Sequence, residues 1–170
     1  MKRCCVLTLT VVLALGSVSF AQVQQGDNEL SFSSAYNNTR LSDGHHTEVA
    51  TISGLWGHFF TDNIEAGPMG AWTHTEFVDI YSIDAFGRWH FMTEQQIVPY
   101  VGGLVGVNYA DPEDGDSSTG VEYGPLAGIK FFATEDVCIF AEYTVKWFGG
   151  DVGDDIDYLQ TLSVGVSFLF

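Results

Sequence analysis

Basic residues are scarce in this chain. The 170 residues contain six Lys and Arg against 22 Asp and Glu, which gives a formal net charge of −16 at pH 7. Tight binding of DNA or RNA depends on Lys and Arg contacts to phosphates, so we expect no nucleic-acid partner. Cysteine is nearly absent as well, with three residues in the whole chain: Cys4, Cys5 and Cys138.

Long apolar runs are also lacking. The one candidate, VLTLTVVLAL (6–15), has ten residues, about half of the roughly 20 that a membrane-spanning helix needs. It follows Lys2 and Arg3 and precedes small residues that end at Ala21, which is the order of a secretory signal peptide. We therefore expect a signal peptide at 1–21 and one exported domain at 22–170. Cys138 alone would then remain, and one thiol forms no internal disulfide.

A two-residue period dominates the rest of the chain. In YSIDAFGRWHF (81–91), VEYGPLAGIKF (121–131) and VCIFAEYTVKW (137–147), one face is apolar and the other carries the charges. These segments exceed the roughly five or six residues usual in soluble strands but suit tilted strands that cross a membrane. Further candidates bring the total to eight strands; they lie at 28–36, 46–60, 64–74, 97–109 and 158–170.

The connections between these segments alternate in length. Short ones are expected at 61–63, 92–96 and 133–136, and longer polar ones at 37–45, 73–79, 110–120 and 149–157. Tight turns at one end and longer loops at the other are typical of outer-membrane barrels. The predicted fold class is therefore all-β, an eight-stranded antiparallel up-and-down transmembrane β-barrel, with its N-terminus in the periplasm and its long loops outside the cell.

Several stretches of the chain resemble the small outer-membrane β-barrel proteins of the OmpA/OmpX-like (porin family) type. They are FFTDNIEAG (59–67), IVPYVGGLVGV (97–107), GPLAGIKFFATEDV (124–137), AEYTVKWF (141–148) and SVGVSFLF (163–170). The resemblance covers essentially all of 22–170 and implies an integral protein of the outer membrane, surrounded by lipid and lipopolysaccharide. Because that family includes structural anchors and adhesins, it implies a structural or surface-interaction role.

The charged faces are expected to point into the barrel. A Lys or Arg that faces hydrocarbon at mid-membrane costs about 2–4 kcal/mol, whereas an eight-stranded barrel has an interior just wide enough for side chains to fill. Buried charges need partners. We therefore predict one internal ionic cluster that would block free diffusion, made of Asp84, Arg88, Glu142 and Lys146. Lys130 and Glu122 are expected nearer opposite ends.

Aromatic residues and prolines refine this prediction. Two aromatic belts should mark the membrane interfaces, with Trp89, Phe91 and Phe131 at the periplasmic side and Tyr123, Tyr143 and Trp147 at the outer side.

Pro68 and Pro125 lie inside predicted strands, where each removes a backbone donor. We interpret both as bulges or rim positions.

The last ten residues, TLSVGVSFLF (161–170), alternate cleanly. Leu162 belongs to the expected lipid-facing side of this strand, which should pair with the first strand near Leu30 and Phe32. The terminal pattern also resembles the signal that the outer-membrane assembly machinery reads in this family. It is carried here by Val164, Val166, Phe168 and Phe170.

Two predicted loops are strongly acidic. One contains Asp111, Glu113, Asp114 and Asp116, and the other Asp151, Asp154, Asp155 and Asp157. Clustered carboxylates suit Ca²⁺, and they could also bridge through divalent cations to lipopolysaccharide phosphates. The spacing departs from an EF-hand, because Asp116 stands where Gly is needed. Solvated loops are the simpler interpretation.

The histidines form no recognisable catalytic or metal-binding motif. His45 and His46 are adjacent, and His74 lies near Glu76, but no Ser lies two residues from a histidine on any predicted strand. An activated nucleophile needs such a neighbouring base. We expect no enzymatic activity, no cofactor and no metal site. The alternatives to a structural or surface role are a small passive pore and a lipid A-modifying enzyme.

Overall fold

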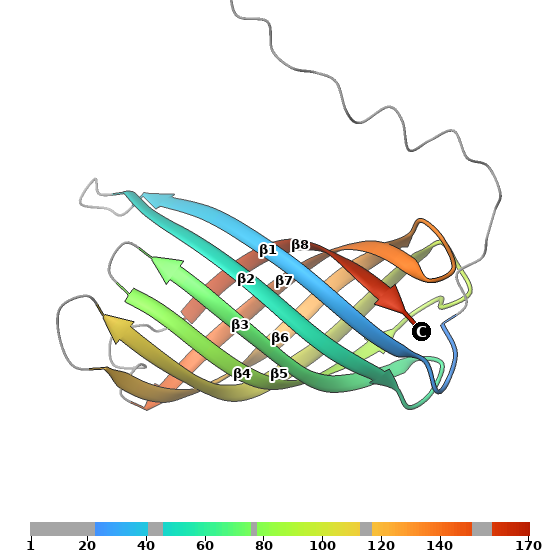
Figure 1. Cartoon of the computed structure of the whole chain (residues 1–170), viewed down its shortest axis with the longest axis horizontal. Coiled ribbons are helices and arrows are strands. Elements are labelled where there is room, and N and C mark those ends of the chain that lie inside the picture. The colour runs from blue at the N-terminus through green and yellow to red at the C-terminus, as the bar shows by residue number, and fades with distance from the viewer. Residues whose placement is uncertain (1–22, 41–45, 76–77, 113–116, 151–157) are drawn as a thin grey trace, which may run out of the picture.

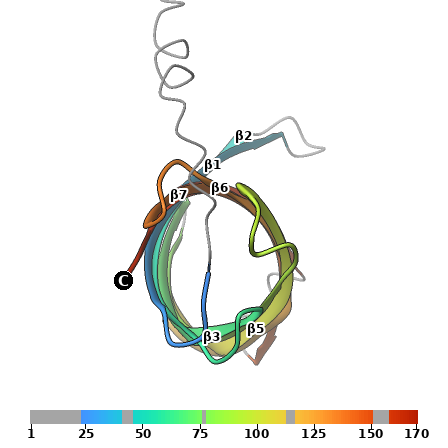
Figure 2. The same ribbon diagram turned by 90° about the vertical axis from the view of Figure 1, so that its right-hand side faces the viewer.

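The computed structural model describes residues 23–40, 46–75, 78–112, 117–150 and 158–170, so the expected signal peptide at 1–21 lies outside it. Within these ranges eight antiparallel strands form a closed barrel in which each strand pairs with the next and the last pairs with the first (Figures 1 and 2). They are β1 (Asn28–Arg40), β2 (His46–Phe59), β3 (Ile64–Thr75), β4 (Val78–His90), β5 (Ile97–Pro112), β6 (Ser118–Phe132), β7 (Val137–Gly150) and β8 (Tyr158–Leu169). The predicted fold class is confirmed. No helix of the described residues is long and apolar enough to cross a membrane.

The two ends of the barrel differ. The near end, as we call it, carries the turns at 60–63, 91–96 and 133–136 together with residues 23–27 and Phe170. At the opposite, far end the strands run further than the sequence indicated, because β1, β3, β5 and β7 extend into the predicted long loops. The prediction of a long loop at 73–79 is wrong, since β3 continues to Thr75 and β4 begins at Val78. Neighbouring strands pair through backbone groups, so polar side chains do not end them.

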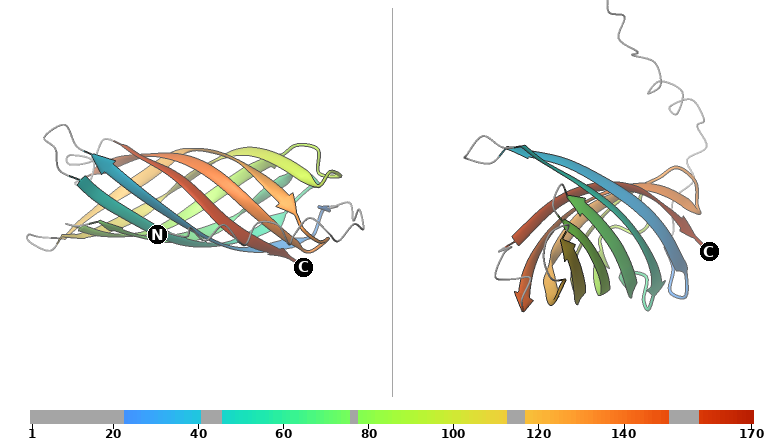
Figure 3. Two further views of the ribbon diagram at one scale, coloured as in Figure 1. Left: turned by 90° about the horizontal axis from the view of Figure 1, so that it is seen from above. Right: turned by 60° about the vertical axis from the view of Figure 1, so that its left-hand side comes forward.

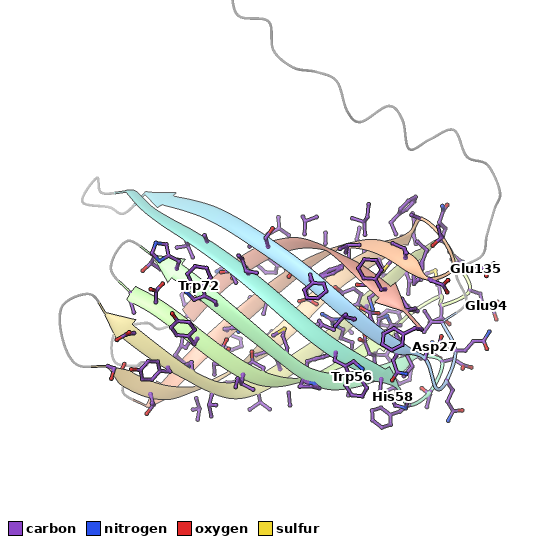
Figure 4. The ribbon with its side chains drawn as sticks, in the orientation of Figure 1. Asp27, Trp56, His58, Trp72, Glu94 and Glu135 are labelled. Carbon is purple, nitrogen blue, oxygen red and sulfur yellow. The ribbon has the colours of Figure 1, made fainter. Side chains whose placement is uncertain are left out.

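Alternation separates an apolar outside from a packed inside. Large apolar side chains remain exposed on the outer surface along every strand, and the most exposed within the strands are Ile83 at 70%, Val105 at 60% and Leu162 at 58%. All six residues expected in the aromatic belts are among the exposed ones. Figure 4 shows the labelled Trp56 pointing outward near one end and Trp72 nearer the other. The outer surface therefore has the composition of a surface that contacts hydrocarbon.

Apolar side chains close the near end. The segment before β1 crosses the mouth of the barrel (Figure 2), where Gln25 N donates to Asp62 Oδ1 at 2.8 Å and Gly26 N donates to the Phe59 carbonyl at 2.9 Å. These bonds hold Val23 inside the mouth. The resulting near-end plug consists of Val23, Phe59, Val98, Phe132, Cys138 and Leu169, all buried.

Pro68 and Pro125 interrupt the sheet without a bulge. In the β2–β3 ladder the pairing stops at Leu55↔Met69 and resumes at His58↔Ala66. The β6–β7 ladder has the same gap around Pro125. Each gap leaves two residues on both strands, so the register is kept and the bulge or rim interpretation is wrong. The missing proline N–H accounts for each gap, in the interior of the strand.

A glycine precedes each of these prolines because the neighbouring strand comes too close for a side chain. A Cβ atom at Gly67 would overlap the Trp56 carbonyl oxygen, and one at Gly124 would overlap the Val145 carbonyl oxygen. Both carbonyls lie opposite the position where the proline lacks its donor. The Gly-Pro pairs thus let the strands stay in contact where one hydrogen bond is absent.

Replacing Gly67 with Ala should therefore destabilise the barrel by about 1–3 kcal/mol, the usual cost of forcing an atom into a packed site. Gly87→Ala is the matched control, because Gly87 pairs with Ala66 on the adjacent strand and a Cβ there meets no atom within 4 Å. The measurement is urea unfolding of detergent-folded protein, followed by tryptophan fluorescence. Equal stability of the two variants would contradict this account of the gap.

Candidate functional site

The half of the barrel interior toward the near end holds a network of charged side chains that we call the near-end network. Its charged and ionisable members come from five strands and are Glu29, Glu65, Arg88, His90, Lys130 and Glu142. All of them are 6% exposed or less. Side chains of a strand alternate between its two faces, and each of these residues stands at a position that faces the barrel interior.

Arg88 and Lys130 are the two permanent cations of this network. The guanidinium Nη2 of Arg88 lies 2.6 Å from Glu142 Oε2, and Nη1 lies 3.6 Å from Glu65 Oε2. Lys130 Nζ donates to Glu29 and lies 3.3 Å from Glu65 Oε2. Arg88 and Glu65 are register partners on the neighbouring strands β4 and β3. The other three ion pairs connect strands that are not neighbours in the sheet, so they tie different walls of the barrel together.

A histidine and a tyrosine complete the near-end network. His90 Nε2 donates to Glu65 Oε2 at 2.9 Å, and the Tyr100 hydroxyl donates to Glu142 Oε2 at 3.0 Å. The Tyr100 ring also lies 5.0 Å from the Arg88 guanidinium carbon and 5.5 Å from Lys130 Nζ. Such cation–π contacts stabilise a desolvated cation. The ring therefore belongs to the electrostatics of the site as well as to its packing.

A second, smaller network lies toward the far end. Lys146 Nζ donates to Glu122 and lies 3.3 Å from Asp84 Oδ2. Asn108 Nδ2 donates to Glu122 Oε2 at 3.3 Å. The Lys146 side chain is 13% exposed, more than any cation of the near-end network. We call this group the far-end network.

The four residues predicted to form one cluster lie at two levels. Arg88 pairs with Glu142, and Lys146 pairs with Asp84. Arg88 and Asp84 share a face of β4 but are four residues apart, which separates them by about 13 Å along the strand. The same spacing separates Glu142 from Lys146 on β7. Lys130 lies in the near-end network and Glu122 in the far-end one.

Sequence reasoning missed four members of the near-end network: Glu29, Glu65, His90 and Tyr100. For two of them the sequence did indicate an inward side chain. Glu29 alternates with the outward Leu30, and Glu65 follows the outward Ile64. Alternation shows which side chains point inward. It does not show which of them meet across the barrel.

A small cavity lies beside the two networks. It has a volume of about 40 Å³, and Glu142 and Lys146 lie on its wall. This is room for a few water molecules, on the order of two or three. Its other polar lining atoms are hydroxyls, those of Ser33, Thr51, Ser53, Thr73, Thr144, Thr161 and Ser163. The near-end network and the near-end plug separate this cavity from the near-end mouth of the barrel.

The described part of the chain contains no group of three or more His, Cys, Asp or Glu arranged to hold a metal ion. The carboxylates of both networks instead face Lys, Arg or His side chains. Of the two acidic loops, Asp111 is described and exposed, whereas the other seven acidic residues and His45 lie outside the described residues. Cation binding there stays a prediction.

The residues predicted as an assembly signal lie on the outer surface of β8 and just after it. Val164 is 55% exposed, Phe168 is 43% exposed and Phe170 is 69% exposed. Leu30 pairs with Phe168 and Phe32 with Val166, as the alternation of both strands indicated. A role of these side chains in assembly stays a prediction.

One histidine outside the barrel interior is held by a carboxylate. His74 Nδ1 donates to Asp79 Oδ1 at 2.8 Å, and Trp72 Nε1 donates to the same oxygen at 3.2 Å. The pair lies near the far end and is solvent-accessible, with the His74 side chain 56% exposed. Asp79 was missed because it follows His74 by five residues, across the turn to β4.

Comparison with solved structures identifies the fold. The chain is similar to Neisserial surface protein A, with a TM-score of 0.64 and 20% identity over 86% of this chain and 98% of that one. The N-terminal β-barrel domain of Pseudomonas aeruginosa OprF gives 0.60 and 18% over 86% and 98%. The Yersinia pestis outer membrane protein Ail gives 0.54 and 18% over 86% and 100%. No protein-family model and no curated protein sequence matches the chain. At these identities the likeness shows the fold, that of a small outer-membrane β-barrel.

Arg88→Leu should destabilise the barrel by about 3–5 kcal/mol, because it leaves buried carboxylates without their cation. Urea unfolding of detergent-folded protein measures the loss. Adding Glu142→Gln to Arg88→Leu should restore part of it, since the second change removes the charge that the first one stranded. Lys146→Met is the control, with a smaller loss expected at a partly exposed cation. An Arg88→Leu barrel as stable as the unmodified protein would contradict the role given to this pair.

Proposed function

We propose that this chain is an integral outer-membrane β-barrel protein whose filled interior suits a structural or surface-interaction role. The observation that carries the proposal is the division of the barrel into an apolar outside and a paired, charged inside. A closed barrel leaves no unpaired sheet edge, which hydrocarbon demands. In water, an exposed apolar belt of this extent would favour aggregation.

The near end would face the periplasm and the far end the outside of the cell. Short turns at the near end support this orientation, because outer-membrane barrels place short turns on the periplasmic side. The expected signal peptide supports export. Two of the similar structures are, by their names, a surface protein and an outer membrane protein. Both names agree with a role at the cell surface.

The expected partners follow from this placement. Lipid and lipopolysaccharide would surround the apolar belt, and the barrel assembly machinery would recognise Val164, Val166, Phe168 and Phe170. Divalent cations at the acidic loops would bridge the far end to lipopolysaccharide phosphates. A passive pore is the weaker alternative, because the near-end plug and both networks fill the interior.

A lipid-modifying enzyme is the second candidate, and the His74–Asp79 pair is the observation that favours it. A carboxylate that orients an imidazole is part of many hydrolytic sites. The pair also lies near the far end, where the outer leaflet would be. Overexpression followed by mass spectrometry of lipid A tests this candidate. A new lipid A species that disappears in His74→Ala would support it over the non-enzymatic role.

The folded protein should migrate differently on a denaturing gel before and after boiling, because a closed barrel keeps its shape in detergent until it is heated. Reconstituted in a planar bilayer, it should show no stepwise conductance, since the near-end plug and the two networks fill the interior that the structure describes. A fully soluble protein without a gel shift would contradict the membrane assignment. Regular conductance steps would favour the pore.

Phe170→Ala should reduce the amount of protein in the outer membrane several-fold while leaving refolding in detergent nearly unchanged. The side chain is exposed, so its loss leaves no cavity, and the effect would arise in assembly. Val107→Ala is the control, a lipid-facing truncation away from β8. Equal losses in cells and in vitro would show that Phe170 acts through stability instead.

A further inference from the structure

The outer surface of the barrel has a hollow near its far end, over β4, β5 and β6. Most of its lining residues form two rows, and the residues of each row are paired across β4, β5 and β6. The row nearer the far end is Tyr81, Tyr109 and Thr119, and the deeper row is Ile83, Val107 and Val121. The hollow has a volume of about 580 Å³, within the range of about 300–1,000 Å³ typical of ligand sites.

Side chains of different size create this hollow. The deeper row is aliphatic, and the tyrosines stand above it. On the β7 side, Val121 faces Gly149, and Gly150 also borders the hollow without a side chain. Two residue pairs deeper, at the next outward-facing pair of these strands, the rings of Tyr123 and Trp147 form a ledge with their centroids 6.0 Å apart. The far-end aromatic belt is thus interrupted over these two glycines, and we call the opening the girdle gap.

The chemistry of the girdle gap fits an apolar chain with a neutral polar head. Among the residues that the structure describes, none that lines the girdle gap is charged. Its side-chain polar groups are the hydroxyls of Tyr81, Tyr109 and Thr119. The Asn108 amide points into the barrel, where it donates to Glu122. The hydroxyls belong to the row that lies toward the far-end interface, and aromatic belts mark the depth of lipid headgroups and esters.

We propose that the girdle gap seats one acyl chain of a membrane lipid, with its ester at the level of the Tyr81 and Tyr109 hydroxyls. This inference rests on the proposed membrane location. The hollow is continuous with the lipid-facing belt, because Ile83, Val107 and Val121 are each at least half exposed on the same outer surface. A second copy of the chain is the poorer occupant, since stable protein interfaces use about 20–30 residues on each side.

Photolabelling tests the proposal. The protein is folded into phosphatidylcholine vesicles that contain a small share of phosphatidylcholine with a diazirine in the upper part of one acyl chain. After irradiation, mass spectrometry maps the labelled residues. We expect labelling around Val107 and Val121 to exceed labelling around Ile129 several-fold. Ile129 is the matched reference, because it is 52% exposed, against 50% for Val121, and lies on the same face of β6 beside the near-end belt residue Phe131.

Two variants separate a seated chain from ordinary lipid contact. Val121→Trp fills the girdle gap and should reduce labelling at Val107 to the level of Ile129. Ile129→Trp adds the same bulk to the same strand and should leave labelling at Val107 unchanged. Both positions face lipid, so both variants should fold, which the gel shift verifies.

Three results would overturn the proposal. They are uniform labelling along β5 and β6, an unchanged pattern in Val121→Trp, and cross-links at these residues between two copies of the chain. Equal labelling by a diazirine fatty acid would also overturn it, because a free acid lacks the ester assigned to the tyrosine level. A chain that does not insert into the vesicles overturns the proposed function as well, whereas an inserted barrel with uniform labelling overturns the lipid seat alone.

Discussion

The closing ladder between β8 and β1 is the constraint on which the rest of this structure depends. Hydrocarbon offers no partner for a strand edge, so a sheet that crosses a membrane must pair its last strand with its first. With eight strands, closure leaves an interior only as wide as the side chains that fill it. Once the ring is closed, alternation alone decides that Arg88 and Lys130 lie inside and that Ile83 and Val105 lie outside.

That same logic explains how much could be read from the sequence. The eight strands and the inward direction of Asp84, Arg88, Glu142 and Lys146 followed from a two-residue period and from the cost of a charge in lipid. Contacts across the barrel did not follow, because Lys130 and Glu29 are 101 residues apart and meet only through the tilt and stagger of the strands. The prolines were likewise expected to cause bulges. In the structure, the Gly-Pro pairs keep the strand register although one backbone donor is missing.

Small barrels could have two kinds of activity, transport through the centre and activity on the outer surface, and the filled interior affects only the first. Transport needs a path through the centre, and the near-end plug with the two networks occupies that path. What remains available is the outside: the apolar belt, the girdle gap, the His74–Asp79 pair and the far end. Any activity of this protein is therefore expected on its outer surface.

The ion pairs of the two networks also have a mechanical consequence. In cross-section, Arg88–Glu142 and Lys130–Glu29 in the near-end network and Lys146–Asp84 in the far-end network are chords that join strands on different sides of the ring. The wall itself is a single sheet, seen from the side in Figure 3, and a thin tube of this kind flattens readily under lateral load. Chords at two heights resist flattening, so the pressure of the surrounding bilayer is borne partly by electrostatic attraction inside the protein. The stiffness of the barrel then depends on the few ion pairs that cross its interior.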